Sequence, residues 1–118
     1  MLTIRREQLN LLATGRRKDF ETRLAGHLLR FFPDKVSFLG EGELQAFIRQ
    51  GSARAAGYGF DSERDICKYL GLMCVFGRDF DSDSRLPWAA EILRKPFRTS
   101  RSKMNRLMEV ALAHAESA

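Results

Sequence analysis

The 118-residue sequence has few cysteines, which could cross-link the chain, and few prolines, which break helices: 2 and 3, respectively. It also has only 1 tryptophan. No apolar run approaches the roughly 20 residues that cross a bilayer. The opening segment, MLTIRR, also lacks the apolar h-region of a secretory signal. We therefore expect a cytoplasmic protein that neither spans nor binds a membrane.

The two cysteines are not expected to form a disulfide. Cys67 and Cys74 lie within one predicted helix, and their spacing separates them by about 10.5 Å along its axis. A disulfide requires Cα atoms within about 7 Å of each other. The spacing, with no neighbouring histidine, is not a zinc-binding pattern either. Both residues are therefore predicted to be small buried hydrophobic side chains.

Sequence signatures of catalysis and nucleotide binding are absent. The chain contains no Gly-x-Ser-x-Gly elbow, Walker loop, dinucleotide fingerprint or HExxH pattern. The only histidines, His27 and His114, fall within predicted helices, where we expect half-buried structural roles. The sequence therefore predicts a non-enzymatic protein without a cofactor. An unrecognised pair of carboxylates is the remaining route to catalysis.

Helical periodicity is present along almost the whole chain. A hydrophobic content of 44% and a charged content of 30% are typical of a folded protein, and the length is that of one domain. No segment alternates with the period of a strand. We predict an all-α fold, a single-domain compact bundle of four to five helices over residues 1–118. The first predicted helix follows Thr3 and extends to residue 32, and a short turn lies in 34–39. The second helix covers 41–56, and the third runs from Asp61 or Ser62 to Gly77. The fourth runs from Pro87 to Arg94, and the last begins at Thr99 or Ser100.

Two features of these helices bear on packing. The segment from Leu70 to Phe76 is apolar nearly all round, so we predict that its helix lies at the centre of the domain. Gly51 allows another helix to approach closely, at a cost of up to about 1 kcal/mol in helix propensity. Residues 14–19 interrupt the apolar stripe of the first helix, which either bends there or continues.

Alternating aspartates follow the predicted central helix at Asp79, Asp81 and Asp83. Calcium loops begin in this way because several oxygen ligands must converge on one cation. The sixth and twelfth positions, counted from Asp79, hold Ser84 and Ala90 instead of the glycine and glutamate that an EF-hand needs. We therefore predict no metal site. The acidic loop is expected to be a solvated turn that accepts local backbone hydrogen bonds. It is also expected to hold a basic partner at the rim of the interface.

Aromatic residues flank the acidic loop. Phe80 and Trp88 are predicted to anchor a partner, because aromatic side chains beside polar loops often contribute to interfaces. A small helical domain also uses its aromatic residues for packing. For Trp88 a core position therefore stays open as the alternative.

The net charge of +5 is unevenly distributed. Residues 40–93 hold six basic and nine acidic residues, whereas residues 94–106, the basic strip, hold six basic residues and no acidic one. Cations near a helix start are electrostatically unfavourable, which favours an acidic protein partner over a purely structural role. Opposite patches also permit self-association. The basic strip consists of Arg94, Lys95, Arg98, Arg101, Lys103 and Arg106.

A nucleic acid is the alternative partner for these cations. Basic strips supply phosphate contacts in nucleic-acid-binding proteins, and Arg16, Arg17 and Lys18 form a second basic cluster. No helix-turn-helix, KH or RRM signature accompanies them, and Phe97 is the only interleaved aromatic residue.

Four stretches together resemble a known group of proteins: IRREQL at 4–9, YGFDSERDICKYL at 58–70, FGRDFD at 76–81 and LPWAA at 86–90. The chain, over residues 3–112, is similar to small helical proteins that proteobacteria encode beside type VI secretion spike, PAAR-tip and effector-chaperone genes. Ser84 stands where many of these relatives have proline. The resemblance brings no catalytic residues. It implies an accessory adaptor or chaperone, ahead of an immunity protein, for a secreted effector, spike or PAAR component.

Overall fold

The computed structural model describes the backbone of residues 6–117 and the side chains of residues 19–115. This part of the chain is helical and contains no strand, so the all-α prediction is confirmed. The first helix continues without a break through residues 14–19, and its predicted cap, Thr3, lies outside the described residues. The helices are α1 (Arg6–Phe31), α2 (Pro33–Val36), α3 (Glu41–Gly57), α4 (Glu63–Phe76), α5 (Pro87–Arg94) and α6 (Ser100–Ser117).

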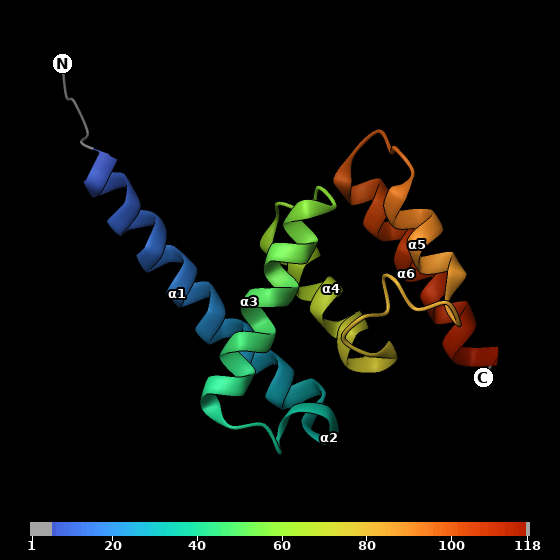
Figure 1. Cartoon of the computed structure of the whole chain (residues 1–118), viewed down its shortest axis with the longest axis horizontal. Helices are drawn as coiled ribbons and strands as arrows, with labels where there is room; N and C mark the ends of the chain where they lie inside the picture. Colours follow the sequence, from blue (N-terminus) through green and yellow to red (C-terminus); the bar gives the residue numbers. More distant parts are fainter. Residues whose placement is uncertain (1–5, 118) are drawn as a thin grey trace.

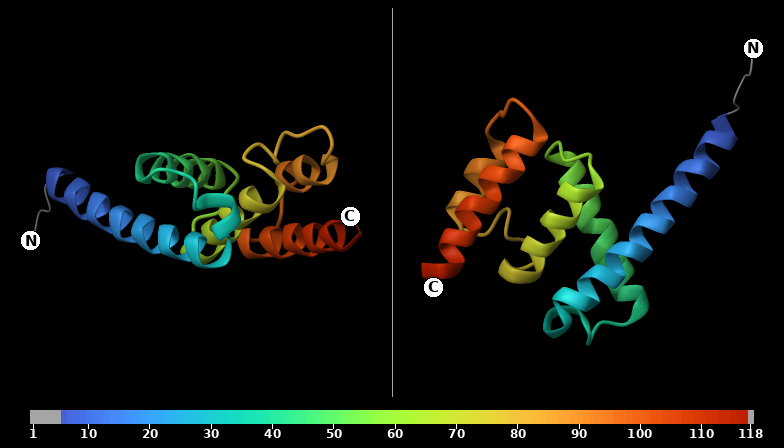
Figure 2. Two further views of the ribbon diagram at one scale, coloured as in Figure 1. Left: turned by 90° about the horizontal axis from the view of Figure 1, so that it is seen from below. Right: turned by 180° about the vertical axis from the view of Figure 1, so that it is seen from behind.

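Helix α4 occupies the centre of the arrangement, where it packs against α1, α2, α3 and α6. On one side of α4, helices α5 and α6 form a hairpin, while the N-terminal half of α1 extends away from the other helices (Figure 1). The molecule is therefore flat and elongated, with extents of 57 × 38 × 20 Å. The side view in Figure 2 shows α3 and α5 in one layer, with α6 and the end of α1 in the other. None of the helices in the described part is long and apolar enough to cross a membrane.

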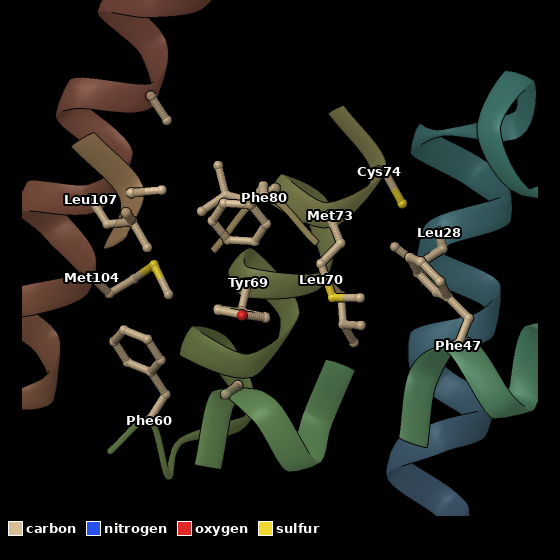
Figure 3. Close-up of a cluster of buried hydrophobic side chains, with 14 of the residues drawn as sticks. Leu28, Phe47, Phe60, Tyr69, Leu70, Met73, Cys74, Phe80, Met104 and Leu107 are labelled. Atoms are coloured by element: carbon tan, nitrogen blue, oxygen red, sulfur yellow. The ribbon is translucent and has the colours of Figure 1, made fainter. Parts of the chain in front are cut away.

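The hydrophobic core is built around α4. Tyr69 and Leu70 are fully buried, and Figure 3 places them between Met104 and Leu107 of α6 on one side and Leu28 of α1 on the other. Each such side chain contributes about 1.5–3 kcal/mol when it leaves water. The prediction that this helix lies at the centre is confirmed.

Gly51 lies where α3 meets α4. A Cβ atom at this position would overlap the Cδ2 atom of Leu70 and lie 2.8 Å from the sulfur atom of Met73. The predicted close approach of another helix at Gly51 is therefore confirmed. This approach brings the backbone of α3 against the apolar side chains of α4.

The ends of the helices follow local chemistry. The Ser62 hydroxyl accepts a 3.1 Å hydrogen bond from the Asp65 N–H at the start of α4, and the Thr99 hydroxyl accepts one of 3.0 Å from the Ser102 N–H before α6. Gly77 ends α4 with a φ of 111°, a conformation that favours glycine. These boundaries are those expected from the sequence.

Candidate binding site

The aromatic residues predicted to anchor a partner belong to the core. Phe80 is fully buried, with its ring centroid 5.1 Å from that of Tyr69 (Figure 3), because the loop after α4 folds back over that helix. Trp88 is 7% exposed; its ring stacks on His114 at 5.0 Å and meets the edge of Phe76 at 5.3 Å. The predicted anchor role of Phe80 and Trp88 is therefore corrected, since neither ring is available to a partner.

The acidic loop is only partly solvated. Asp79 keeps 71% of its side chain exposed, and Asp83 accepts hydrogen bonds of 2.9 Å from both the backbone N–H and the guanidinium of Arg85, as expected for a turn. These bonds hold the pKa of the Asp83 carboxyl below its usual value. Asp81, in contrast, is buried, which corrects the prediction of a solvated side chain. No group of three or more possible metal-binding side chains occurs among the described residues.

Asp81 is buried because two residues near the end of α3 bind its carboxylate. The hydroxyl of Tyr58 donates a hydrogen bond of 2.7 Å to Oδ2, and Nη1 of Arg54 lies 3.3 Å from Oδ1. Arg54 also donates to Asp79 Oδ1 at 3.0 Å and to the Arg78 carbonyl at 2.9 Å. Burial, followed by the bond to Asp81, raises the pKa of Tyr58 to about 12. This network holds the acidic loop against α3.

Lys103 of the basic strip has a structural role. Its Nζ atom donates a hydrogen bond of 2.7 Å to the carbonyl of Tyr58 and lies 5.5 Å from the centroid of the Phe60 ring. Burial lowers the pKa of this ammonium group. Lys103 therefore joins α6 to the end of α3, and its charge is directed into the molecule.

The rest of the basic strip is divided between paired and exposed cations. Lys95, at the end of α5, pairs with Glu91 of that helix at 3.0 Å. Arg106 pairs with Glu109 at 3.3 Å within α6. The remaining members are exposed and have no ion pair with another residue of 19–115: Arg94, Arg98 and Arg101. The second basic cluster, residues 16–18, lies outside the described side chains.

A groove that was not predicted from the sequence lies on the other face of α4. It has a volume of about 500 Å³ and is bounded by the end of α1 and by the C-terminal half of α6. Its lining includes Gly71 and Val75 of α4, which we call its floor, together with Phe32 and Leu112, and the other lining residues are mostly apolar. We call this feature the α4 groove. It lies opposite the face of α4 that packs on Gly51 of α3.

The apolar character of α4 explains the groove. One face of the helix is buried against α3, whereas Val75 on the other face is 48% exposed, and Leu112 of α6 is 57% exposed beside it. An apolar helix surface that the fold leaves uncovered is typical of an interaction site. The sequence signal for the groove is the excess of apolar residues around this helix, which predicts a central position but does not indicate which face stays uncovered.

Cys67 lies where the α4 groove meets a shallower depression of about 250 Å³ that extends to Phe20 of α1. The Cys67 side chain is half-buried, and burial raises the pKa of its thiol. Cys74 is buried outside the groove, with its pKa raised to about 11 for the same reason. Both thiols are free, as expected.

Within residues 19–115, the α4 groove and the three exposed arginines of the basic strip are available to a partner. Comparisons of this chain with protein-family models, with curated proteins and with solved structures found no match.

Proposed function

We propose that this protein is a non-enzymatic helical adaptor or chaperone that binds a type VI secretion effector, spike or PAAR component in the cytoplasm. The resemblance of residues 58–70, 76–81 and 86–90 to small proteins encoded beside such genes supports this assignment. The single structural observation that carries a binding role is the α4 groove, an apolar surface at the centre of the fold that no described residue covers.

The ion pairs that the acidic loop makes within the protein favour an adaptor or chaperone over an immunity protein. An immunity protein that blocked a basic catalytic cleft would need carboxylates free to meet it. Here the carboxylates of Asp79 and Asp81 bind Arg54, and that of Asp83 binds Arg85. An adaptor needs instead an apolar receptor surface for a segment of its cargo, and the α4 groove supplies one.

Capture from a native lysate tests the proposal. The tagged protein is expected to co-purify, under gentle conditions, with a spike, PAAR or effector component identified by mass spectrometry. The variant Leu112→Glu places a charge in the groove at an exposed position and should lose that component. Phe38→Glu is the matched control, because Phe38 is 75% exposed and does not line the groove. Recovery of no such component by the wild-type protein would overturn the assignment.

A nucleic-acid-binding protein is the second candidate, and the three exposed arginines of the basic strip favour it. Binding through these residues would show a slope of log affinity against log salt of about −2.7 for duplex and about −2.1 for single-stranded oligonucleotides. Titration of duplex and single-stranded oligonucleotides at two salt concentrations measures this slope. Micromolar binding with that dependence, lost in Arg98→Glu/Arg101→Glu, would replace the adaptor assignment. Weak binding that the double substitution leaves unchanged favours the adaptor.

A further inference from the structure

We propose that the α4 groove receives one amphipathic helix of the partner, with its apolar face on α4 and acidic side chains toward Arg64 and Lys68. This inference deepens the proposed function, on which it rests for the existence of a protein partner. Three features of the groove support it: the absence of polar groups on its floor, its open side and the charge at one end.

The floor of the groove favours a helix over an extended segment. Gly71 and Val75 offer no polar side-chain atom, and their backbone groups lie inside α4. An extended peptide seated here would lose water from its backbone N–H and C=O groups without gaining partners. A helix satisfies these groups within itself. Helix-in-groove docking is a recurrent way for proteins to bind such a surface.

The openness of the groove requires a ligand with one apolar face. Val75 and Leu112 retain about half of their surface in the unbound protein, so the groove covers only one side of what binds it. A small apolar ligand such as an acyl chain is usually enclosed over most of its surface.

The charge around the groove selects an acidic partner. Arg64 and Lys68, one turn apart on α4, line the groove and have no ion pair with any residue of the described range 19–115. No acidic residue of the described range 19–115 lines the main groove, and Glu63 beside it is already bound to Arg23 at 3.0 Å. Glutamates or aspartates flanking the apolar face of the bound helix would therefore complement this end.

Two synthetic helical peptides test the inference on the full chain. They share one apolar face, flanked by glutamates in the first and by lysines in the second. Binding is measured by fluorescence anisotropy of the labelled peptide and by the rate of alkylation of Cys67, which falls with the fraction of groove occupied. Cys74 is the internal control, because it lies outside the groove. We expect the glutamate peptide to bind about tenfold more tightly than the lysine peptide and to protect Cys67 alone.

Charge reversal separates recognition from a structural effect. Arg64→Glu/Lys68→Glu should fold, since neither side chain is buried or has an ion pair with another residue of 19–115, and should bind the lysine peptide better than the glutamate peptide. Leu112→Glu should bind neither, whereas Phe38→Glu should bind as the wild type does. Equal affinity for the two peptides, no protection of Cys67, or protection by oleate but by neither peptide overturns the inference.

The failures of the two proposals are distinguishable. If the glutamate peptide binds with the expected charge preference but the lysate contains no secretion component on the protein, the helix-binding groove stands and the secretion role falls. If a spike, PAAR or effector component is captured equally by wild type and Leu112→Glu, the secretion role stands and the groove inference is overturned.

Discussion

The hydroxyl of Tyr58 and the carboxylate of Asp81 are joined by a hydrogen bond of 2.7 Å, which connects the end of α3 to the loop that follows α4. Arg54 binds the other oxygen of the same carboxylate, and Lys103 of α6 binds the carbonyl of Tyr58. Tyr58 therefore links three segments that are distant in the sequence. Its interactions determine the position of the acidic loop and of the start of α6.

Removal of the Asp81 carboxylate should destabilise the fold. Asp81→Ala leaves the Tyr58 hydroxyl and the Arg54 guanidinium without their buried acceptor, so we expect a loss of about 1–3 kcal/mol in the free energy of unfolding. The measurement is chemical denaturation. Asp79→Ala is the matched control, because its exposed ion pair contributes only about 0–1 kcal/mol. Equal losses for the two variants would contradict a special role for Asp81.

The stability of the protein should fall at alkaline pH. Tyr58 has a pKa of about 12 in the folded protein against an ordinary value of 10.0, chiefly because it is buried. The unfolded chain therefore releases the phenolic proton first, so the stabilising contribution is complete below pH 10 and is lost between pH 10 and 12. The pKa of Tyr69, the other tyrosine, is also raised by burial.

Tyrosinate absorbance measures this effect directly. At pH 10 the native protein should show little tyrosinate, whereas the chain in denaturant should be about half ionised. Tyr58→Phe should reduce the alkaline decline in stability between pH 10 and 12, and the remainder should come from Tyr69. Native tyrosinate that appears at the same pH as in the denatured chain would refute the prediction.

Truncation of Trp88 should damage the core. Trp88→Ala removes a ring that packs on Phe76 and His114, and we expect a loss of about 3–5 kcal/mol in the free energy of unfolding. Thermal melting monitored by circular dichroism measures this loss. Phe38→Ala, at an exposed aromatic position, should change stability by less than about 0.5 kcal/mol. A Trp88→Ala protein that melts like the wild type would contradict the core position.

Because α3 lies close to α4, alanine substitution at two glycines of α3 should affect stability differently. Gly51→Ala should cost about 1–3 kcal/mol, despite the better helix propensity of alanine, because the new methyl group overlaps Leu70. Gly42→Ala introduces a Cβ atom that meets nothing within 4 Å, and should be neutral or stabilise by up to about 1 kcal/mol. Denaturation of both variants tests the pair, and a stabilising Gly51→Ala would show that the helices are farther apart.

The start of α4 and of α6, and the end of α4, could be predicted from the sequence because they depend on neighbouring residues. Ser62 and Thr99 cap N–H groups three residues ahead, and Gly77 adopts a positive φ at the end of α4. Gly51 also indicated a close helix contact, since only the absence of a side chain permits it. The all-α fold class and the central position of α4 follow from the same local patterns of capping and apolar periodicity.

The binding surface depended on contacts between distant parts of the chain. Asp81 binds residues 23 and 27 positions earlier, and Lys103 binds a carbonyl 45 positions earlier, separations at which a sequence pattern carries no pairing information. The burial of Trp88 could not be predicted from its neighbours in the sequence, because the ring that stacks on it, His114, belongs to α6.

The sequence by itself determined the helices, their ends and the excess of apolar residues on α4. The tertiary structure alone decided which of those residues stay uncovered. Packing of α3 buries one face of α4, whereas α1 and α6 lie at the edges of the other and leave the α4 groove between them. The physical reason is that local chemistry specifies a helix, but burial of each face requires a partner from elsewhere in the chain.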